Sequence, residues 1–367
     1  MHLTCNKELL QKYISSADRI TGKHPSLPIL NSVLLNANNK TLIIRSTNLE
    51  VGVEFEIQAD IKKQGSVALP GALLANALAS IYNEQEVTLV AVDGICKITT
   101  KTKTLTIKGF LSDDFPTIPI VNNNNEEFIM SSEKFTHGVK AVIMSAAVSD
   151  IKPEISSVYL YQNGDAVVFV ATDSFRLAEK KIKQNGVTIS HGIIIPAKNI
   201  LEVMRLLEST NEDIRFLITK NQISCRGKSV YITSRVIQGV YPDYEQILPK
   251  TNTTEMIVLK EDLINTIKLS TLFSDKFHKI TITVDPLKKI CSVSTKNNDI
   301  GETESNLTAT LKGDPIEISL NGKHLFDCFS VIEKDSIIVQ FNGPDKPAVI
   351  RGLGDPSFTY LTMPLTH

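Results

Sequence analysis

The sequence predicts an α+β protein made of three similar domains, each with paired helices packed on antiparallel sheets. Three observations lead to this fold class. Two kinds of helical apolar pattern recur along the chain, one of them at a constant spacing of about one domain length. Most of the remaining segments are short runs rich in β-branched residues, which are typical of strands. Polar stretches separate one repeat from the next.

The first helical pattern occurs three times. In residues 7–20 the apolar side chains return every three or four positions and therefore share one face of a helix. Residues 133–148 and 261–273 have the same periodicity. Each segment is expected to form an amphipathic helix near the start of its domain.

The second helical pattern gives the spacing of the repeat. It begins near Pro70, Pro196 and Gly322, and successive starts are 126 residues apart. Pro70 and Pro196 suit the first turn of a helix, where the missing N–H costs no hydrogen bond. Pro116 and Pro242, in the similar stretches DDFPTI and VYPDYEQI, are again 126 residues apart. Agreement among these features indicates an internal repeat rather than chance.

Strands and linkers complete the predicted domains. The strand-like runs are TLIIRST, VGVEFEI, EVTLVAV, VVFVATD, YITSRVI, KITITV and SIIVQF. The polar stretches NNNNEE (122–127) and KTNTTE (250–255) are suited to linkers. We therefore expect domains at residues 1–125, 126–253 and 254–367.

The composition limits the classes of function. The 367 residues carry a net charge of −1, with 42% hydrophobic and 22% charged residues. So small a net charge excludes wholesale electrostatic binding of nucleic acid but leaves room for one basic surface. The five cysteines are far apart and form no CxxC, and we find neither a signal peptide nor a long apolar run. We expect reduced thiols in a cytoplasmic protein.

No catalytic motif survives inspection. CRGKSV (225–230) lacks the first glycine of a P-loop, and residues 352–354 lack the third glycine of a dinucleotide loop. The seven histidines are scattered, so we expect no catalytic residue, no metal site and no cofactor. Asp173 beside Ser174 could belong to a hydrolase, which is the alternative function from the enzyme class. Asp173 is better suited to accepting backbone N–H bonds within a turn.

The repeat also suggests a ring. Domains of this size have a diameter of roughly 35 Å, so three of them enclose a hole of only about 5 Å, whereas six enclose about 35 Å. Duplex DNA is roughly 20 Å wide, so a closed dimer could surround it. Basic residues on the expected helices would then contact phosphates without reading sequence, namely Lys12, Arg19, Lys140, Lys198, Arg205 and Lys268. An open, sequence-independent DNA-binding module remains the alternative, and the second helix, 71–81, has no basic residue.

Over essentially its whole length the sequence resembles the bacterial sliding clamp, the beta subunit of DNA polymerase III. The matching pieces, in order, are SLPILNSVLL, TNLEVGVE, DDFPTI, ATDSFRLA, IPAKNILEVMRLL, YPDYEQILPK, LFSDKF and YLTMPL. The resemblance implies the DNA clamp fold, in which one chain is half of a six-domain, head-to-tail homodimeric ring around duplex DNA. It also implies a nucleoid-associated processivity factor. Its partners would be the polymerase III catalytic subunit, the clamp loader and other proteins with a clamp-binding motif.

The resemblance further implies an apolar pocket for partner peptides, formed by the ATD turn, the PDY segment and the C-terminal MP segment. The pocket would comprise Ile155, Thr172, Ser174, Phe175, Arg176, Leu177, Pro242, Ile247, Pro347, Leu361 and Met363. A shallower extension would comprise Lys152, Asn321, His324, Pro364 and Leu365. Arg176 would offer a hydrogen-bond donor to the peptide at the rim.

The same resemblance assigns other contacts and shows where this sequence departs from the family. Leu105 and Ile107 would meet Leu272 and Phe273 of a second copy at the dimer seam, and Lys23 and His24 stand where the family usually has a DNA-contacting arginine. The departures in the pocket are Ser174 and Phe175 in place of glycine and histidine, Gln246 in place of arginine, and Thr366 and His367 at the end. The location of the pocket is therefore better predicted than its peptide preference.

Overall fold

The computed structural model describes residues 1–22, 27–121 and 126–365. Its helices follow the predicted repeat and are α1 (Lys7–Ile20), α2 (Gly71–Ala79), α3 (Ser132–Val142), α4 (Ala197–Leu207), α5 (Lys260–Thr271) and α6 (Gly322–Phe329). The helix predicted at 7–20 is confirmed with the same limits. The one predicted at 133–148 ends early, because the backbone tightens into a 3-10 turn at Ile143–Ser145.

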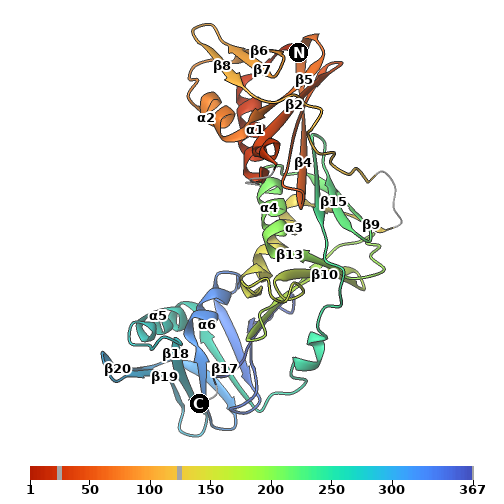
Figure 1. Ribbon diagram of the computed structural model, residues 1–367. Coiled ribbons are helices and arrows are strands. Elements are labelled where there is room, and N and C mark those ends of the chain that lie inside the picture. Colours follow the sequence, from red (N-terminus) through yellow and green to blue (C-terminus); the bar gives the residue numbers. More distant parts are fainter. Residues whose placement is uncertain (23–26, 122–125, 366–367) are drawn as a thin grey trace. The chain divides into compact units, whose positions relative to one another are not determined.

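Sequence and capping explain the limits of α1. The side chain of Asn6 accepts a hydrogen bond from Leu9 N, which satisfies one of the free N–H groups at the start of the helix. Leu10, Ile14, Ala17 and Ile20 are buried along one stripe, as the periodicity predicted. In Figure 1, α1 lies beside α2 at the N-terminal end of the chain.

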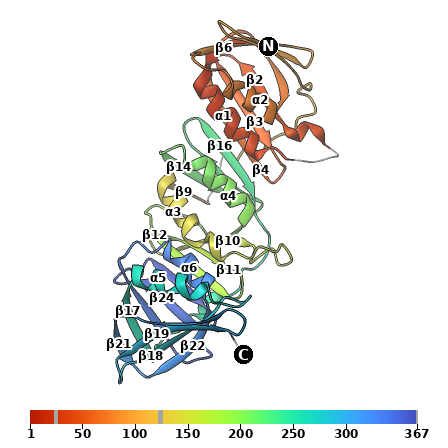
Figure 2. The same ribbon diagram turned by 90° about the vertical axis from the view of Figure 1, so that its left-hand side faces the viewer.

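The described residues form three antiparallel sheets. The first has 12 strands, which are β1 (His2–Asn6), β2 (Ser32–Asn38), β3 (Thr41–Thr47), β4 (Val51–Lys63), β5 (Gly65–Pro70), β6 (Glu86–Val92), β7 (Ile95–Thr99), β8 (Thr104–Lys108), β9 (Glu126–Ser131), β14 (Asp213–Ile218), β15 (Gln222–Arg226) and β16 (Val230–Arg235). Its main path is β8-β7-β6-β1-β4-β16-β15-β14-β9. The pairing of β4 with β16 therefore joins the first and second predicted domains. Figure 2 shows α1 against β2, β3 and β4.

The second sheet has nine strands among the described residues. They are β10 (Ser157–Asn163), β11 (Ala166–Thr172), β12 (Arg176–Lys183), β13 (Ile193–Pro196), β17 (Thr254–Leu259), β21 (Ala309–Gly313), β23 (Ser336–Phe341), β24 (Ala348–Gly352) and β25 (Phe358–Thr362). The pairing of β12 with β25 joins the second and third predicted domains in the same way. Strand β25, near the end of the chain, thus lies beside the turn that connects β11 to β12.

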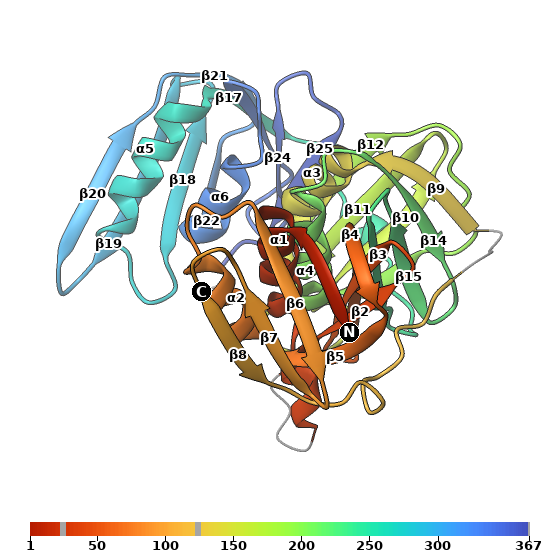
Figure 3. The same cartoon turned by 90° about the horizontal axis from the view of Figure 1, so that it is seen from above.

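A third, four-stranded sheet has the order β20-β19-β18-β22. Its strands are β18 (Lys279–Asp285), β19 (Ile290–Asn297), β20 (Gly301–Asn306) and β22 (Ile316–Asn321). In Figure 3, α5 crosses one face of β18, β19 and β20.

The chain divides into two compact units. One contains residues 1–136, 188–190 and 198–236, and the other contains residues 137–187, 191–197 and 237–367. The residues of the predicted central domain are shared between them, because each of the two large sheets continues from one repeat into the next. Within the part of the chain that is described, no helix has the length and apolarity needed to cross a membrane.

Candidate partner-peptide site

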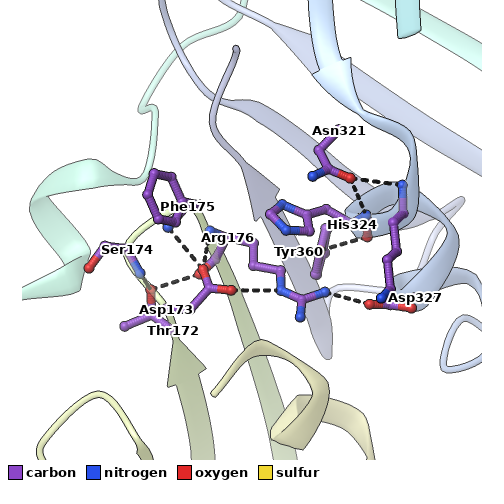
Figure 4. Close-up of polar contacts among 10 residues, drawn as sticks. Thr172, Asp173, Ser174, Phe175, Arg176, Asn321, His324, Asp327 and Tyr360 are labelled. Carbon is purple, nitrogen blue, oxygen red and sulfur yellow. Dashed lines mark hydrogen bonds and ion pairs between the residues drawn. The ribbon is translucent and has the colours of Figure 1, made fainter. Parts of the chain in front are cut away.

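The turn between β11 and β12 is held by its own side chains. The hydroxyl of Thr172 accepts from Ser174 N over 3.2 Å and donates to the carbonyl of Arg176 over 2.7 Å. The Oδ1 atom of Asp173 accepts from Phe175 N and Arg176 N, each over 2.9 Å. The prediction that Asp173 caps the turn is confirmed (Figure 4).

The first unit contains a second copy of this turn. The hydroxyl of Thr47 bonds to Val51 O and Leu49 N, while Asn48 Oδ1 accepts from Glu50 N and Val51 N. These are the same bonds, residue for residue, as in the turn at 172–176. Leu49 and Ser174 both have a positive φ, of 74° and 77°. The internal repeat therefore extends to the hydrogen bonds of a turn, which the sequence had not revealed.

Strand β12 separates the predicted pocket into two faces. Successive side chains of a strand point to opposite sides of the sheet, so Arg176 and Leu177 face opposite ways. Leu177 lies directly opposite Thr172 on β11 and Leu361 on β25. We call the side that carries Leu177 and Leu361 the outer face.

The residues of the outer face belong to a buried apolar cluster. It contains Val168, Val170, Leu177, Ile194, Tyr241, Tyr244 and Leu361, and Met363 packs against it. Leu177 and Leu361 are 0% and 1% exposed. Phe175 is 65% exposed and Ile247 is 46% exposed, in contrast to both leucines.

Arg176 is committed to partners within the chain. Its Nε donates to Asp173 Oδ2 over 3.0 Å and its Nη1 donates to Asp327 Oδ2, on α6, over 2.6 Å. Only 13% of its side chain is exposed. These bonds use two of the five guanidinium N–H groups, so donation from Arg176 to a peptide at the rim stays a prediction. Figure 4 shows the guanidinium between the two carboxylates.

His324 lies in the same network, on α6. Burial lowers its pKa from the ordinary value of 6.5, and the positive charge of Arg176 lowers it further. The carbonyl of His324 accepts from Tyr360 Oη over 2.7 Å, and Asn321 caps the helix by accepting from Lys323 N and His324 N. Two of the residues predicted for the extension, Asn321 and His324, thus belong to a hydrogen-bonded helix end.

The other predicted pocket residues lie around the apolar cluster and the hydrogen-bond network of Arg176. Met363 N donates to Phe175 O and Leu365 N donates to Ser319 O, so the terminal segment runs between β12 and β22. Pro347 directly precedes β24, whose first residue pairs with Thr362. The remaining predicted positions are half-buried at Ile155 and Pro364, and exposed at Lys152, Ser174 and Pro242.

The predicted DNA-contacting residues that the structure describes are all exposed on helices. They are Lys12 and Arg19 on α1, Lys140 on α3, Lys198 and Arg205 on α4, and Lys268 on α5. Arg205 is paired with Glu202, with 2.5 Å between Nη1 and Oε1. Lys23 and His24 lie outside the described residues, as do Thr366 and His367.

The predicted dimer-seam residues differ in their exposure. Leu272 is 72% exposed directly after α5, and Ile107 is buried on β8. Leu105 and Phe273 are half-buried, and the ring of Phe273 approaches Gly301 at the start of β20.

Sequence reasoning missed several residues that hold this site together. Asp327 and Tyr360 complete the network of Arg176, and Tyr161 and Glu179 bond to Tyr244. Asp327 follows His324 by three positions and so shares its helix face, which is the one signal that could have found it. In the described ranges no group of three His, Cys, Asp or Glu residues could hold a metal ion.

Comparison with known families decides the identity of this fold. Models of the N-terminal, central and C-terminal domains of the DNA polymerase III beta subunit match residues 1–119, 129–243 and 245–366. The chain belongs to the DNA polymerase III beta subunit family. It has the function of that family, as a sliding clamp and processivity factor in DNA replication, and it is not an enzyme.

Individual relatives and structures agree with the family assignment. Beta sliding clamps of Synechococcus elongatus and Staphylococcus aureus are 25% and 24% identical to the chain and align with all of it and with 99% of their own length. The sliding clamp of Bacillus subtilis superposes with a TM-score of 0.95 at 21% identity, over 100% of this chain and 99% of that one. A Pseudomonas aeruginosa clamp bound to griselimycin gives 0.94 at 22% identity, over the whole of both chains. The predicted clamp fold and family are confirmed.

Proposed function

We propose that two copies of the chain join head to tail into a closed ring that surrounds duplex DNA. The observation that carries this proposal is a pair of sheet edges of opposite charge. Strand β8 is the end strand of the first sheet and has Lys103 and Lys108 at or beside it, both exposed. Strand β20 is the end strand of the third sheet and exposes Glu302 and Glu304.

Unpaired edges of this kind are suited to pairing with another strand. If β8 of one copy meets β20 of the other, backbone hydrogen bonds and charge complementarity act at the same seam. A two-fold axis then makes two identical seams, so the ring closes with no edge left over. Leu105, Leu272 and Phe273 would add apolar contact at each seam, with Ile107 beneath it.

The DNA contacts that we propose are electrostatic and independent of sequence. Lys140, Lys198, Arg205 and Lys268 are exposed on three helices, with Lys12 and Arg19 on a fourth. Side chains of this type neutralise phosphates and release counterions, so binding should weaken steeply with salt. Lys23 and His24 are proposed to contribute in the same way.

We further propose that the outer face beside the turn at 172–176 captures short apolar segments of the polymerase, the clamp loader and other DNA enzymes. Phe175, Ile247 and Met363 offer partly exposed apolar surface above a buried floor. Residues of this kind act as anchoring contacts for aromatic and aliphatic side chains. The domain limits 1–125, 126–253 and 254–367 remain our assignment of the three repeats.

Retention on DNA tests the ring directly. The protein, loaded by its clamp loader, should stay on a nicked circular plasmid and be lost after the plasmid is linearised. Enclosure predicts this difference in retention because a closed ring can leave the DNA only by sliding off a free end. A module that binds one side of the duplex would be lost from both forms at the same rate, and that result would overturn the ring.

A further inference from the structure

A network of three buried or half-buried polar side chains lies beneath the segment that forms one wall of the proposed pocket. The hydroxyl of Tyr244 donates to Glu179 Oε2 over 2.6 Å. The hydroxyls of Tyr161 and Tyr244 are 2.7 Å apart. The single proton of Tyr244 is used on Glu179, so Tyr161 is the donor to Tyr244. We call these three side chains the hydroxyl network.

The network joins the sheet to the segment that crosses it. Tyr161 is on β10 and Glu179 is on β12, and Tyr244 begins the 3-10 turn Tyr244–Ile247. Glu179 is 4% exposed, and its Oε1 lies 3.0 Å from Lys181 Nζ. Both carboxylate oxygens therefore have a partner, as a buried charge requires.

The position of Tyr244 fixes its two pocket neighbours. Pro242 and Ile247 lie on either side of it in the sequence and are themselves exposed, whereas Tyr244 is buried in the cluster with Leu177 and Leu361. Tyr241, directly before Pro242, is buried in the same cluster, and Leu248, directly after Ile247, packs against it. The placement of Pro242 and Ile247 over the floor thus depends on Tyr244 together with these flanking residues.

The electrostatics of the network favour a fixed geometry. Burial raises the pKa of Tyr244 above 10, and the bond to Glu179 raises it further, so the phenol remains a donor at every physiological pH. The bond from a phenol to a carboxylate is charge-assisted and stronger than one between neutral groups.

The segment that contains Pro119 and Val121 is held in a different way and provides a comparison. Tyr231, on β16, donates its hydroxyl to the carbonyl of Pro119 and accepts from Val121 N. Here the sheet supplies the tyrosine and the crossing segment supplies only backbone atoms. In the Pro242–Ile247 segment the anchor is a side chain of the segment itself, Tyr244.

We propose that the hydroxyl network positions the Pro242–Ile247 wall of the pocket and thereby controls how long a partner peptide stays bound. This inference rests on the proposed pocket and adds Tyr161 and Glu179 to it as positioning residues. Neither of them needs to touch the peptide.

The test compares tyrosine-to-phenylalanine variants, which keep the ring and remove the hydroxyl. The probe is a fluorescein-labelled synthetic peptide with adjacent leucine and phenylalanine residues, followed by fluorescence anisotropy and by stopped-flow dissociation. Tyr244→Phe should weaken binding about tenfold, mainly through faster dissociation, and Tyr161→Phe about threefold, in line with the loss of one or two hydrogen bonds. Tyr231→Phe is the matched control and should change the affinity by less than twofold.

Further readouts separate positioning from general stability. Amide hydrogen exchange of residues 243–248 should quicken in Tyr244→Phe and not in Tyr231→Phe, even where the two variants lose similar thermal stability. Glu179→Gln, whose amide oxygen can still accept from Tyr244, should keep most of the affinity that Glu179→Ala loses. A peptide dissociation rate in Tyr244→Phe equal to that of the wild type would overturn the role of the network. Peptide binding that survives deletion of residues 363–367 would instead overturn the location of the pocket, so the two failures are distinguishable.

Discussion

The guanidinium of Arg176 lies 2.6 Å from Asp327, as measured from Nη1 to Oδ2, and this ion pair ties strand β12 to helix α6. The two residues come from different repeats of the sequence, and Asp173 holds the same guanidinium from the other side. The turn that borders the proposed pocket and the helix that forms its extension are therefore one hydrogen-bonded unit.

Removing the carboxylate of this pair should weaken the fold. Asp327→Ala leaves Arg176 partly buried with only Asp173 as a charged partner, and we expect the free energy of unfolding to fall by about 2 kcal/mol. Thermal unfolding measures the change. Asp345→Ala, at an exposed turn, is the control and should behave like wild type. Equal melting temperatures for both variants would show that the ion pair adds nothing.

Glycine at position 174 should stabilise the protein. Ser174 has a φ of 77°, a region that glycine occupies without steric cost. The backbone strain energy that glycine relieves exceeds the free-energy cost of the extra conformational entropy that glycine loses on folding. Ser174→Gly should therefore raise the free energy of unfolding by roughly 0.5–1 kcal/mol. Ser190→Gly, whose backbone φ is not in that region, should do the opposite in the same urea titration. Destabilisation by both would argue that the strain is negligible.

The seam of the proposed dimer should depend on the residues after α5. Leu272→Ala combined with Phe273→Ala removes apolar surface beside β20, and we expect the mass in light scattering to move from twice 40.5 kDa toward 40.5 kDa. Leu287→Ala, at a leucine in a turn that is 84% exposed, should leave the dimer intact. A wild-type chain that is monomeric at micromolar concentration would count against the ring itself.

Acid should destabilise the fold through His324. Its pKa in the folded protein is lowered, so the unfolded chain binds the proton more readily. The contribution of the neutral imidazole is thus fully present above about pH 6.5 and is lost as the pH falls through and below that value. His324→Gln should flatten the fall in melting temperature between pH 7 and pH 5.5, while His191→Gln, at an exposed position, should not. Parallel profiles for the two variants would exclude His324 as the cause.

The cysteines should resist modification until the protein unfolds. All five are buried, and burial raises their thiol pKa values, to about 12 for Cys5 and about 11 for Cys96 and Cys291. The thiolate is the reactive form, so Ellman's reagent at pH 8 should detect almost none in the native protein and all five in urea. Rapid reaction of one thiol in the native state would reveal local opening around it.

The pocket shows how far sequence reasoning extends. The turn at 172–176 was visible because Asp173 is a residue type that suits a turn, whereas the pocket and the stretches that flank it were predicted from the resemblance to the clamp family. The distant partner of Arg176 was not visible. Its neighbour Asp327 is 151 positions away, and only the pairing of β12 with β25 brings the two repeats together. Glu179 and Tyr161 were missed for the same reason.

The sequence by itself determined the local elements and the repeat. The helix at 7–20, the strand TLIIRST and the spacing of 126 residues follow from apolar periodicity and capping, which act over a few residues. Only the tertiary structure decided that each large sheet continues from one repeat into the next, and that β12 lies beside β25 with Arg176 against Asp327. Strand pairing depends on long-range packing and register, and neither is encoded in a short stretch of chain.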